Sequence, residues 1–591
     1  MFTLPLEVLE LIRGKLPEKE QFNFLFVCRQ WYLVFRATLY HDIVIRSHEQ
    51  LELLLRNALA PSTTTQSPLG HQVKRLTFEH GEITRNMIEQ LALLCPFVES
   101  LAFSFEVWVL LRFPRVFLLW PHLKSLSQPG CEELMELSLS RTESHLEHLT
   151  VQFARTTIDD SLHGVVPSYF DIDMFGDFLY GIRGPSLLTS LTLFGNNQLL
   201  YVSDMKVIHE KCPLLESIQL SQFMLAKEDP QDVECTDYPA ATHLKALEIR
   251  NSLRYPLEWL FYIADKYRNL QKLILHSYLE HSIYWEEGHT TQSFQTTVEA
   301  VNRIAENCRQ LESVELIGLP VDHRFYATLQ CSSKVSKLGL VTLSDVSDIK
   351  DSAQPNFQRS VSSLSVWRFG KTLQRVADIG YFQSLVDLTL YNYSSDLTLV
   401  LNCCKHITKL ALAKGRLDLE NENDISVHHR LTKLALYEVK IGDVALIHIA
   451  SQCTRLEDLT VWNCEMTRQH RLVTSQSADV LIVNLGNRMM NSIHIQSSLN
   501  ARHGGQDPEF VRVMQWSDMQ KTCRDFYFGD VYLRNHPAEI EERCLNTDVV
   551  ARFCQELNND PIINSALSQH GRIIIESGFV KCLTVNFKRI L

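Results

Sequence analysis

The chain has 591 residues and a mass of 68.2 kDa, and 45% of its residues are hydrophobic while 21% are charged. This composition, with only 22 glycines and 19 prolines, excludes collagen-like and wholly disordered chains and leaves ample apolar material for a core. The formal net charge is −12, which argues against a chain that mainly neutralises phosphates, so we expect no nucleic-acid partner.

The first forty residues predict three short helices. Apolar residues at positions 8, 9 and 12 fall on one face of a helix that begins near Pro5 and is broken at Leu16-Pro17. A second apolar run, Phe22 to Val27, leads into the string Val27-Cys28-Arg29-Gln30-Trp31 and a third helix. Because so few residues cannot bury a core unaided, we expect this segment to need a partner.

The middle of the chain repeats the pattern apolar-x-x-apolar-x-apolar. The first apolar residues of the copies are Val73, Val98, Leu188, Leu215, Leu244, Leu270, Leu311, Val335, Val361, Leu385, Ile407, Leu431, Leu456 and Met490. From Val335 to Leu456 the copies lie 26, 24, 22, 24 and 25 residues apart. Such a constant period indicates an array of stacked structural repeats.

Each copy predicts a strand followed by a helix. Alternate side chains of a strand turn to one face, so the second and third apolar positions point into a core together. The stretches between strands, such as Val444 to Ala450, space their apolar residues at helical intervals. One unit of about 25 residues cannot bury its own apolar face, whereas stacked copies bury a continuous one. The predicted fold is therefore a curved α/β solenoid with a parallel inner sheet and outer helices.

The spacing also predicts how the chain is divided. We expect an N-terminal helical segment at residues 1–40, the solenoid at 41–499, and a C-terminal cap or extra lobe at 500–591. Two long steps between copies predict insertions near 156–184 and 278–295.

Two stretches do not follow the regular period. The patterns that begin at Leu123, Leu134 and Leu146 lie too close together for full units, so one of them is expected to be a hairpin or a unit without a helix. Beyond residue 500 the period is lost, although the segment Val580 to Val585 repeats the apolar pattern once.

The repeat resembles the cysteine-containing variety of leucine-rich repeats over most of residues 73 to 499. A cysteine stands three residues before the first repeat position in five units: Cys95, Cys212, Cys308, Cys404 and Cys453. Tyr267 takes this place in a sixth unit, and Asn196 and Cys464 match the Asn or Cys that the family has after the strand. Because the phased cysteines are a whole repeat apart, we interpret them as small buried hydrophobic residues and expect no zinc site.

The N-terminal string LPLEVLELIRGKLPEKEQFNFLFVCRQWYLVF resembles the F-box, and it departs from that family mainly at Gln21. F-box proteins dock on the linker adaptor of cullin-RING (SCF-type) ubiquitin ligases, and an F-box followed by leucine-rich repeats is a known architecture. The resemblance implies that the adaptor, and through it cullin, is bound by Leu4, Pro5, Val8, Leu9, Ile12, Leu16, Pro17, Phe22, Val27, Cys28 and Trp31. The alternative is that these residues are the ordinary core of a helical cap on the array.

A second binding surface is expected on the inner face of the solenoid. Residues that alternate with the core positions point to this face, and the position after each third apolar residue is aromatic at Trp367, Tyr391, Tyr437 and Trp462. Exposed Trp and Tyr on a rigid scaffold dominate binding energy at interfaces, so we expect these four to contact a target protein. The alternative is that the C-terminal lobe folds back and buries them.

The sequence contains no complete motif for catalysis or for binding a nucleotide. Gly370-Lys371-Thr372 ends like a phosphate loop, but Ser365 stands where the loop needs a glycine. Strings for a zinc protease, a serine hydrolase or a dinucleotide site are absent. We therefore expect no catalytic residue, cofactor or metal, and the charges within Leu101 to Trp120 argue against a membrane span.

Together the two resemblances imply the substrate-recognition subunit of an SCF-type E3 ubiquitin ligase, in the cytoplasm, the nucleus or both. The F-box would hold the adaptor, and the inner face of the repeats would hold an unidentified target protein. The alternative is a binding scaffold of the same construction without ubiquitin-ligase output.

Overall fold

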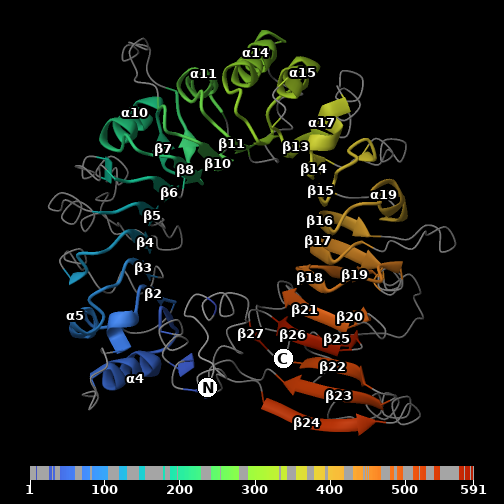
Figure 1. Ribbon diagram of the computed structural model, residues 1–591. Coiled ribbons are helices and arrows are strands. Elements are labelled where there is room, and N and C mark those ends of the chain that lie inside the picture. The colour runs from blue at the N-terminus through green and yellow to red at the C-terminus, as the bar shows by residue number, and fades with distance from the viewer. Residues whose placement is uncertain are drawn as a thin grey trace, which may run out of the picture. The chain divides into compact units, whose positions relative to one another are not determined.

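The computed structural model (Figure 1) describes most of the repeats and little of the first forty residues. The described residues are 8, 26–28, 31–32, 40–59, 69–79, 83–103, 119–129, 145–153, 178–179, 187–195, 197–227, 241–252, 255–277, 291–331, 334–342, 355–368, 379–392, 397–417, 430–442, 446, 449, 452–467, 480–484, 489–496, 510–517, 520–527, 538–545, 572–577, 579–585 and 588–589. They form two compact units: unit 1 is Met1–Leu311 with Gly318–Pro320, and unit 2 is Glu312–Ile317 with Val321–Leu591.

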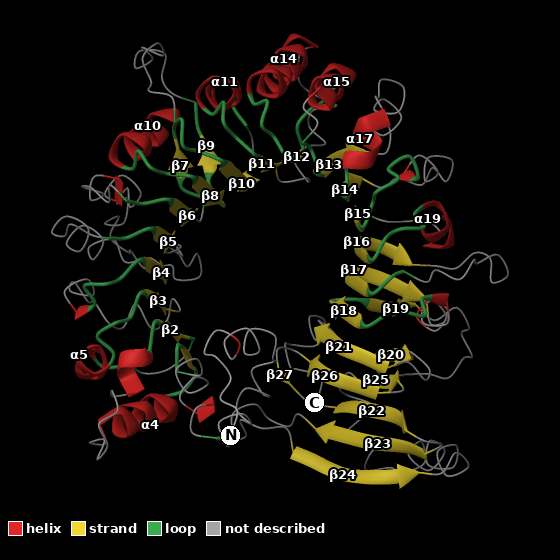
Figure 2. Cartoon of the chain, viewed as in Figure 1, coloured by secondary structure: helices red, strands yellow, loops and turns green. Residues whose placement is uncertain are grey.

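Unit 1 is a parallel sheet with helices on one side of it (Figure 2). Its strands are β1 (Asp42–Ile45), β2 (Arg75–Phe78), β3 (Ser100–Phe103), β4 (Ser125–Pro129), β5 (His148–Gln152), β6 (Ser190–Phe194), β8 (Ser217–Ser221), β10 (Ala246–Ser252) and β11 (Lys272–Ser277), each parallel to the next. Its helices are α4 (His48–Leu59), η1 (Leu69–Gln72), α5 (Arg85–Leu94), α10 (Val202–Lys211), α11 (Leu257–Lys266) and α14 (Thr291–Asn307), and the short strands β7 (Leu199–Leu200) and β9 (Met224–Leu225) pair separately.

Unit 2 shows the same alternation of parallel strands and helices. Its parallel strands are β12 (Ser313–Ile317), β13 (Lys337–Thr342), β14 (Ser363–Arg368), β15 (Asp387–Tyr391), β16 (Lys409–Leu417), β17 (Lys433–Gly442), β18 (Asp458–Trp462), β21 (Met489–Gln496) and β26 (Phe579–Val585). The short strand β19 (Glu465–Thr467) pairs with the end of β17, and β27 (Lys588–Arg589) pairs antiparallel to β26. Its helices are α15 (His323–Cys331), α17 (Pro355–Ser360) and α19 (Leu397–Cys403).

Unit 2 also contains a second sheet, whose strands lie between residues 480 and 577. Its five strands, in spatial order, are β20 (Val480–Asn484), β25 (Arg572–Ser577), β22 (Phe510–Ser517), β23 (Gln520–Tyr527) and β24 (Ala538–Leu545). The strand β26 instead joins the repeat sheet, with Val580 opposite Met490 and Leu583 opposite Ile493. The apolar pattern of Val580 to Val585 is thus a further strand in register, while the division of the chain at residue 500 stays a prediction.

The apolar pattern places the core where the sequence predicts it. The first repeat position, Leu385, which precedes β15, and Leu388 and Leu390 within β15 are all buried, and equivalent residues of unit 1, such as Leu191 and Leu193 in β6, are completely buried. Adjacent strands align these leucines one above another in parallel register. The described chain is therefore an α/β solenoid of leucine-rich repeats.

The phased cysteines close the outer helices. Cys212 donates its backbone N–H to Ile208 O at the end of α10 (2.8 Å) and accepts the N–H of Leu215 (3.3 Å), where the next strand approaches. Burial raises the pKa of the Cys212 thiol to about 12. All five phased cysteines are buried, which confirms that they are small core residues, and Tyr267 is buried at the same position in the sixth unit.

A left-handed residue follows the fifth position of several strands. It is Asn392 after β15 (φ 53°), Lys414 within β16 (φ 50°), Glu438 within β17 (φ 54°) and Asn463 after β18 (φ 48°). This conformation costs a residue other than glycine about 1 kcal/mol or more, and Asn tolerates it best. These four units bend at the same place, whatever residue stands there.

The irregular stretches are only partly described. Strand β4 pairs directly with β5, so the patterns at Leu123 and Leu146 form neighbouring strands, while Leu134 lies outside the described residues. Most of the two predicted insertions also lies outside them, although α14 begins at Thr291. No helix among the described residues combines the length and the apolar character needed to cross a bilayer.

Candidate protein-binding surface

In unit 2 the alternate residues of the strands form three rows on the sheet face that lies away from the core. The first row is Lys337, Ser363, Asp387, Lys409, Lys433, Asp458 and Ser492. The second row is Gly339, Ser365, Thr389, Ala411, Ala435, Thr460 and His494. The third row, from β14 to β18, is Trp367, Tyr391, Ala413, Tyr437 and Trp462. The rows are straight because the parallel register is constant from strand to strand.

The third row brings together the four aromatic residues that the sequence predicts as target-binding. Trp367 and Tyr391 stack face to face with ring centroids 3.6 Å apart and planes 5° apart. Tyr437 and Trp462 form a second, tilted pair with centroids 6.5 Å apart. Ala413 separates the two pairs on strand β16.

These rings are not sealed by the described part of the chain. Tyr437 is 38% exposed, and Trp367, Tyr391 and Trp462 are half-buried. Their flat faces and their polar atoms suit a protein interface, in which Trp and Tyr provide a large contact area for little conformational entropy. Their role in target binding stays a prediction.

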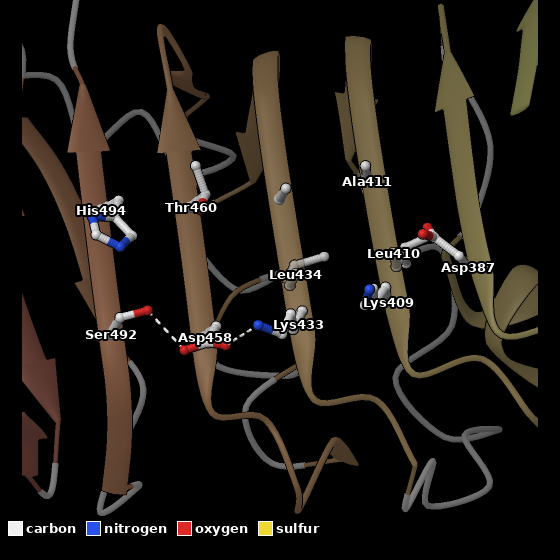
Figure 3. Close-up of a pocket in the computed structure, with 11 residues that line it drawn as sticks. Asp387, Lys409, Leu410, Ala411, Lys433, Leu434, Asp458, Thr460, Ser492 and His494 are labelled. Atoms are coloured by element: carbon white, nitrogen blue, oxygen red, sulfur yellow. Dashed lines mark hydrogen bonds and ion pairs between the residues drawn. The ribbon is translucent and has the colours of Figure 1, made fainter. Parts of the chain in front are cut away.

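The first row carries the charges. Lys433 Nζ lies 2.8 Å from an Asp458 carboxylate oxygen, and Ser492 Oγ donates to the other oxygen at 2.7 Å (Figure 3). Burial alone would raise the pKa of Asp458, but the hydrogen bonds from Lys433 and Ser492 outweigh it and hold the pKa below its ordinary value. Asp458 is thus an anion whose charge is already compensated within the sheet.

Lys409 differs from its neighbour Lys433. It stands between Asp387 on β15 and Lys433 on β17 in the first row. Within the ranges that the structure describes, Lys409 and Asp387 form no ion pair with each other or with any other residue. Within that part of the chain, the Lys409 ammonium is not held by a carboxylate, unlike that of Lys433.

A cavity of about 330 Å³ lies over the first two rows (Figure 3). It is lined by Asp387, Lys409, Leu410, Ala411, Lys433, Leu434, Ala435, Asp458, Thr460, Ser492 and His494. Small side chains, Ala411 and Ala435, form its floor, and the charged first row forms one side. A cavity of this size takes a few side chains of a partner.

The cavity does not have the geometry of a hydrolase site. Ser492, Asp458 and His494 line it together, but the Ser492 hydroxyl donates to Asp458 and so has a carboxylate partner instead of an imidazole base. Among the described residues no three His, Cys, Asp or Glu side chains converge as metal ligands. The arrangement is suited to binding.

The sequence identifies the aromatic residues of the third row, and the same alternation also yields the first row, whereas the second row was missed. Lys337, Asp387, Lys409, Lys433 and Asp458 follow from the alternation of the pattern and are found in the first row. The signal for the second row was present in the residue between the last two apolar positions of each repeat, which is small in β16 and β17. A small residue at this position opens a cavity only where larger residues flank it on the neighbouring strands. The sequence of a single repeat therefore does not reveal the cavity.

The predicted adaptor-binding segment is described at only a few positions. Val8 is helical and 37% exposed, and Val27 is 58% exposed in a turn. Cys28 and Trp31 are half-buried, and the Tyr32 N–H donates to Cys28 O at 2.8 Å, as in the first turn of a helix. The other predicted adaptor contacts lie outside the described residues: Leu4, Pro5, Leu9, Ile12, Leu16, Pro17 and Phe22.

No protein-family model matches this chain, and no curated protein matches it. Similar solved structures include Toll in the Drosophila Toll–Spatzle complex, at 11% identity over 72% of this chain and 46% of that one, with a TM-score of 0.29. They also include the plant peptide hormone receptor RGFR1 with RGF2 (14% identity, 79% and 73% covered, TM-score 0.26) and mouse RP105/MD-1 (13%, 75% and 82%, 0.27). This chain spans less than half of the Toll chain. The solenoid of leucine-rich repeats is defined by the strand register and buried leucines described above.

Proposed function

We propose that this chain is the substrate-recognition subunit of an SCF-type E3 ubiquitin ligase. The N-terminal string would dock the linker adaptor and through it cullin, and the three-row face of unit 2 would hold a target protein. The observation that carries the proposal is the combination of an F-box-like string with a repeat sheet whose aromatic row is accessible. The compartment that fits this role is the cytoplasm, the nucleus or both.

Such a subunit contributes to the reaction by positioning the target protein. A parallel sheet with a buried leucine core holds the binding rows in a constant register, so a bound target is presented in a restricted orientation. A tethered target reaches a high effective concentration near the conjugating enzyme, which does the bond chemistry elsewhere. We propose accordingly that this chain performs no catalytic step itself.

Capture of the adaptor tests the N-terminal half of the proposal. Full-length chain and a Leu4→Ala, Pro5→Ala, Val8→Ala, Leu9→Ala variant are each mixed with purified linker adaptor and recovered by affinity. The wild type is expected to retain the adaptor and the variant to lose it, because the four side chains form the apolar contact. A wild type that never retains the adaptor would overturn both the ligase and the F-box scaffold.

A second candidate is a binding scaffold without ligase output. It is favoured by the position of the aromatic row and the cavity, which belong to unit 2 and need no F-box to bind a protein. Transfer of ubiquitin to a co-purified target in a reconstituted reaction separates the two. Transfer that depends on both the adaptor and the intact aromatic row supports the ligase, and stable binding without transfer supports the scaffold.

A further inference from the structure

The turns that lead into β16, β17 and β18 carry exposed basic residues at the same place. They are Lys405, Arg430 and Arg455, which together form what we call the cationic edge. The turn around Lys405 is closed by a backbone hydrogen bond from Ile407 N–H to Cys404 O (3.3 Å), and the turn around Arg455 is closed in the same way. Because the bonded residues are buried, the residues between them stand on the outside of the turn.

The cationic edge has no acidic partner within the part of the chain that the structure describes. Arg430 Nη1 instead lies 2.6 Å from Nδ1 of His406, so it donates to a neutral imidazole, which leaves its positive charge uncompensated. The one acidic residue within 405–408, 430–432 and 454–457 is Glu457, whose carboxylate accepts a hydrogen bond from Asn491 Nδ2 at 2.9 Å. With histidine neutral, these turn residues have a net charge of +2.

The adjoining first row does not cancel this excess. Its charged residues on β15 to β18, which are Asp387, Lys409, Lys433 and Asp458, sum to zero. The turns and the first row together therefore keep the net charge of +2, in a chain whose formal net charge is −12. The cationic edge is opposite in sign to the chain as a whole.

In unit 1 the solenoid itself supplies counter-charges to lysines of the equivalent turns. Lys74 and Lys124 both form ion pairs with Glu99, at 2.7 and 3.1 Å, and Lys245 pairs with Glu216 at 2.8 Å. Each of these pairs joins neighbouring units of the array. The described part of unit 2 supplies no such counter-charge to the cationic edge, so an external anion is needed to compensate it.

The constant register sets the spacing of the cationic edge. Lys409 is opposite Lys433, and Lys433 is opposite Asp458, so the turns before these strands follow one another at the strand spacing of about 4.8 Å. The three cations thus span about 10 Å across the strands. Side chains on one side of an extended peptide repeat every two residues, or about 6.8 Å, so two of them fit within this length. A single phosphate group would contact only part of the line.

We propose that the cationic edge binds an extended acidic segment of the target protein, rich in Asp and Glu. The proposal rests on the proposed function in that the segment belongs to the captured protein. Charge complementarity selects the occupant. A long polyanion such as a nucleic acid meets the repulsion of a chain with net charge −12, whereas a short acidic segment is affected mainly by charges within the Debye length of about 8 Å at physiological salt.

Fluorescence anisotropy with the purified full-length chain tests this. The probe is a fluorescein-labelled peptide of twelve residues that alternates Glu and Ser, and the matched control peptide has Gln in place of each Glu. The Glu peptide is expected to bind at least about tenfold more tightly than the Gln peptide, and to bind several-fold more weakly when salt is raised from about 50 to about 200 mM. Equal affinity for both peptides would overturn the proposal, as would no binding of the Glu peptide at a protein concentration of about 0.1 mM.

A charge-reversal variant locates the binding. Lys405→Glu, Arg430→Glu, Arg455→Glu is expected to weaken binding of the Glu peptide at least about tenfold, because three attractive charges become repulsive. All three side chains are exposed, so the far-UV circular dichroism spectrum should not change. The milder Lys405→Gln, Arg430→Gln, Arg455→Gln variant removes the charges without adding repulsion and should weaken binding about threefold.

A matched variant controls for the change in net charge. Lys227→Glu, Arg268→Glu, Arg309→Glu makes the same change at three exposed residues of unit 1 and should leave the affinity for the Glu peptide within about twofold of the wild type. An equal loss in both Glu variants would mean that the peptide responds only to the total charge, which would overturn the proposal.

Two further probes separate other anions from an acidic segment. One is the same peptide with phosphoserine in place of two Glu residues, and the other is a twelve-nucleotide oligothymidine. Both are expected to bind no more than about threefold more tightly than the Glu peptide. If only the phosphoserine peptide binds, or if the oligothymidine binds far more tightly, the acidic segment is the wrong occupant.

These measurements need neither the adaptor nor ubiquitin, so they can succeed where the ligase proposal fails. If the adaptor is captured but the cationic-edge variant binds the Glu peptide as the wild type does, the peptide site is wrong and the ligase stands. If the Glu peptide binds at the cationic edge but the adaptor is not captured, the peptide site stands and the ligase is wrong.

Discussion

The two units build their sheets in the same way and present different faces. In unit 1 the first and second rows hold small polar residues, such as Ser125, Ser190 and Thr192, together with paired charges, such as Glu248 and Lys272. In unit 2 the corresponding rows carry opposite charges and a cavity, and the third row carries two aromatic pairs. The leucines that alternate with these residues are buried in both units. The core positions therefore define the repeat, whereas the residues that alternate with them differ between the two units.

The charged residues of the two units also differ in how they are paired. In unit 1, Glu248 is bonded by both Arg250 and Lys272, and these hydrogen bonds outweigh the effect of burial, which raises its pKa, so that the pKa lies below its ordinary value. All three charges are thereby engaged within the sheet. In unit 2, Lys409 has no such partner among the described residues. These charges of unit 1 are thus paired within the sheet, whereas Lys409 of unit 2 has no ion pair within the described part of the chain.

The largest effect on stability is expected from substitutions in the core, and it should be similar in the two units. Leu193→Ala in unit 1 and Leu390→Ala in unit 2 each remove a completely buried side chain, and each should lower the free energy of unfolding of its unit by about 2 to 5 kcal/mol. Denaturant unfolding followed by far-UV circular dichroism measures this. A loss below about 1 kcal/mol in one unit only would show that its sheet is packed differently.

A pH effect should distinguish unit 1. His209 Nε2 lies 2.8 Å from the Tyr267 hydroxyl in the interior, and burial lowers the pKa of His209 to about 4. Between the ordinary histidine pKa of 6.5 and about 4 the unfolded chain binds the proton and the folded chain does not. Stability is therefore complete above about pH 6.5 and falls, by up to about 3 kcal/mol, as the pH drops towards 4.

Denaturant unfolding of the wild type and His209→Gln at pH 7 and pH 4.5 measures this difference. Glutamine does not titrate and can still form a hydrogen bond to Tyr267, so the variant should lose less stability on acidification than the wild type. An equal loss in both proteins would mean that His209 does not carry the pH dependence.

Target capture should depend on the aromatic residues of unit 2 and not on that of unit 1. A Trp367→Ala, Trp462→Ala variant removes one ring from each aromatic pair of unit 2 and should weaken target capture by about tenfold or more, since interface tryptophans each contribute roughly 1 to 2 kcal/mol or more. Phe194→Ala removes the third-row aromatic residue of β6 in unit 1 and should leave capture unchanged. Both variants should still retain the linker adaptor. Equal capture by the tryptophan variant and the wild type would remove the aromatic row from the binding surface.

The smallest effect is expected from backbone strain in unit 2. Glu438 adopts a left-handed conformation (φ 54°) at the position where β15 and β18 are followed by Asn. Its ion pair with Lys414 is long (4.0 Å) and exposed, so it contributes little. Glu438→Asn should therefore raise the free energy of unfolding by about 0.5 to 1 kcal/mol, measured by the shift of the denaturant midpoint. An unchanged or lower midpoint would show that the strain is relieved in another way.

Much of the fold could be predicted from the sequence because the repeat is local. The buried leucines, the strand at each copy, the phased cysteines and Tyr267 in the sixth cysteine position all follow from the pattern of about 25 residues. The pattern could not predict the order of β20, β25, β22, β23 and β24, since those strands pair across long sequence separations without a repeating signal.

For the candidate site, the sequence determined which residues face away from the core, since alternation along a strand follows from backbone geometry alone. It thereby identified Trp367, Tyr391, Tyr437 and Trp462. Only the tertiary structure decided that Trp367 stacks on Tyr391, that Asp458 neutralises Lys433, and that Lys409 stands beside a cavity floored by alanines. The reason is that these properties belong to contacts between strands, and the register that creates such contacts is set when the repeats stack.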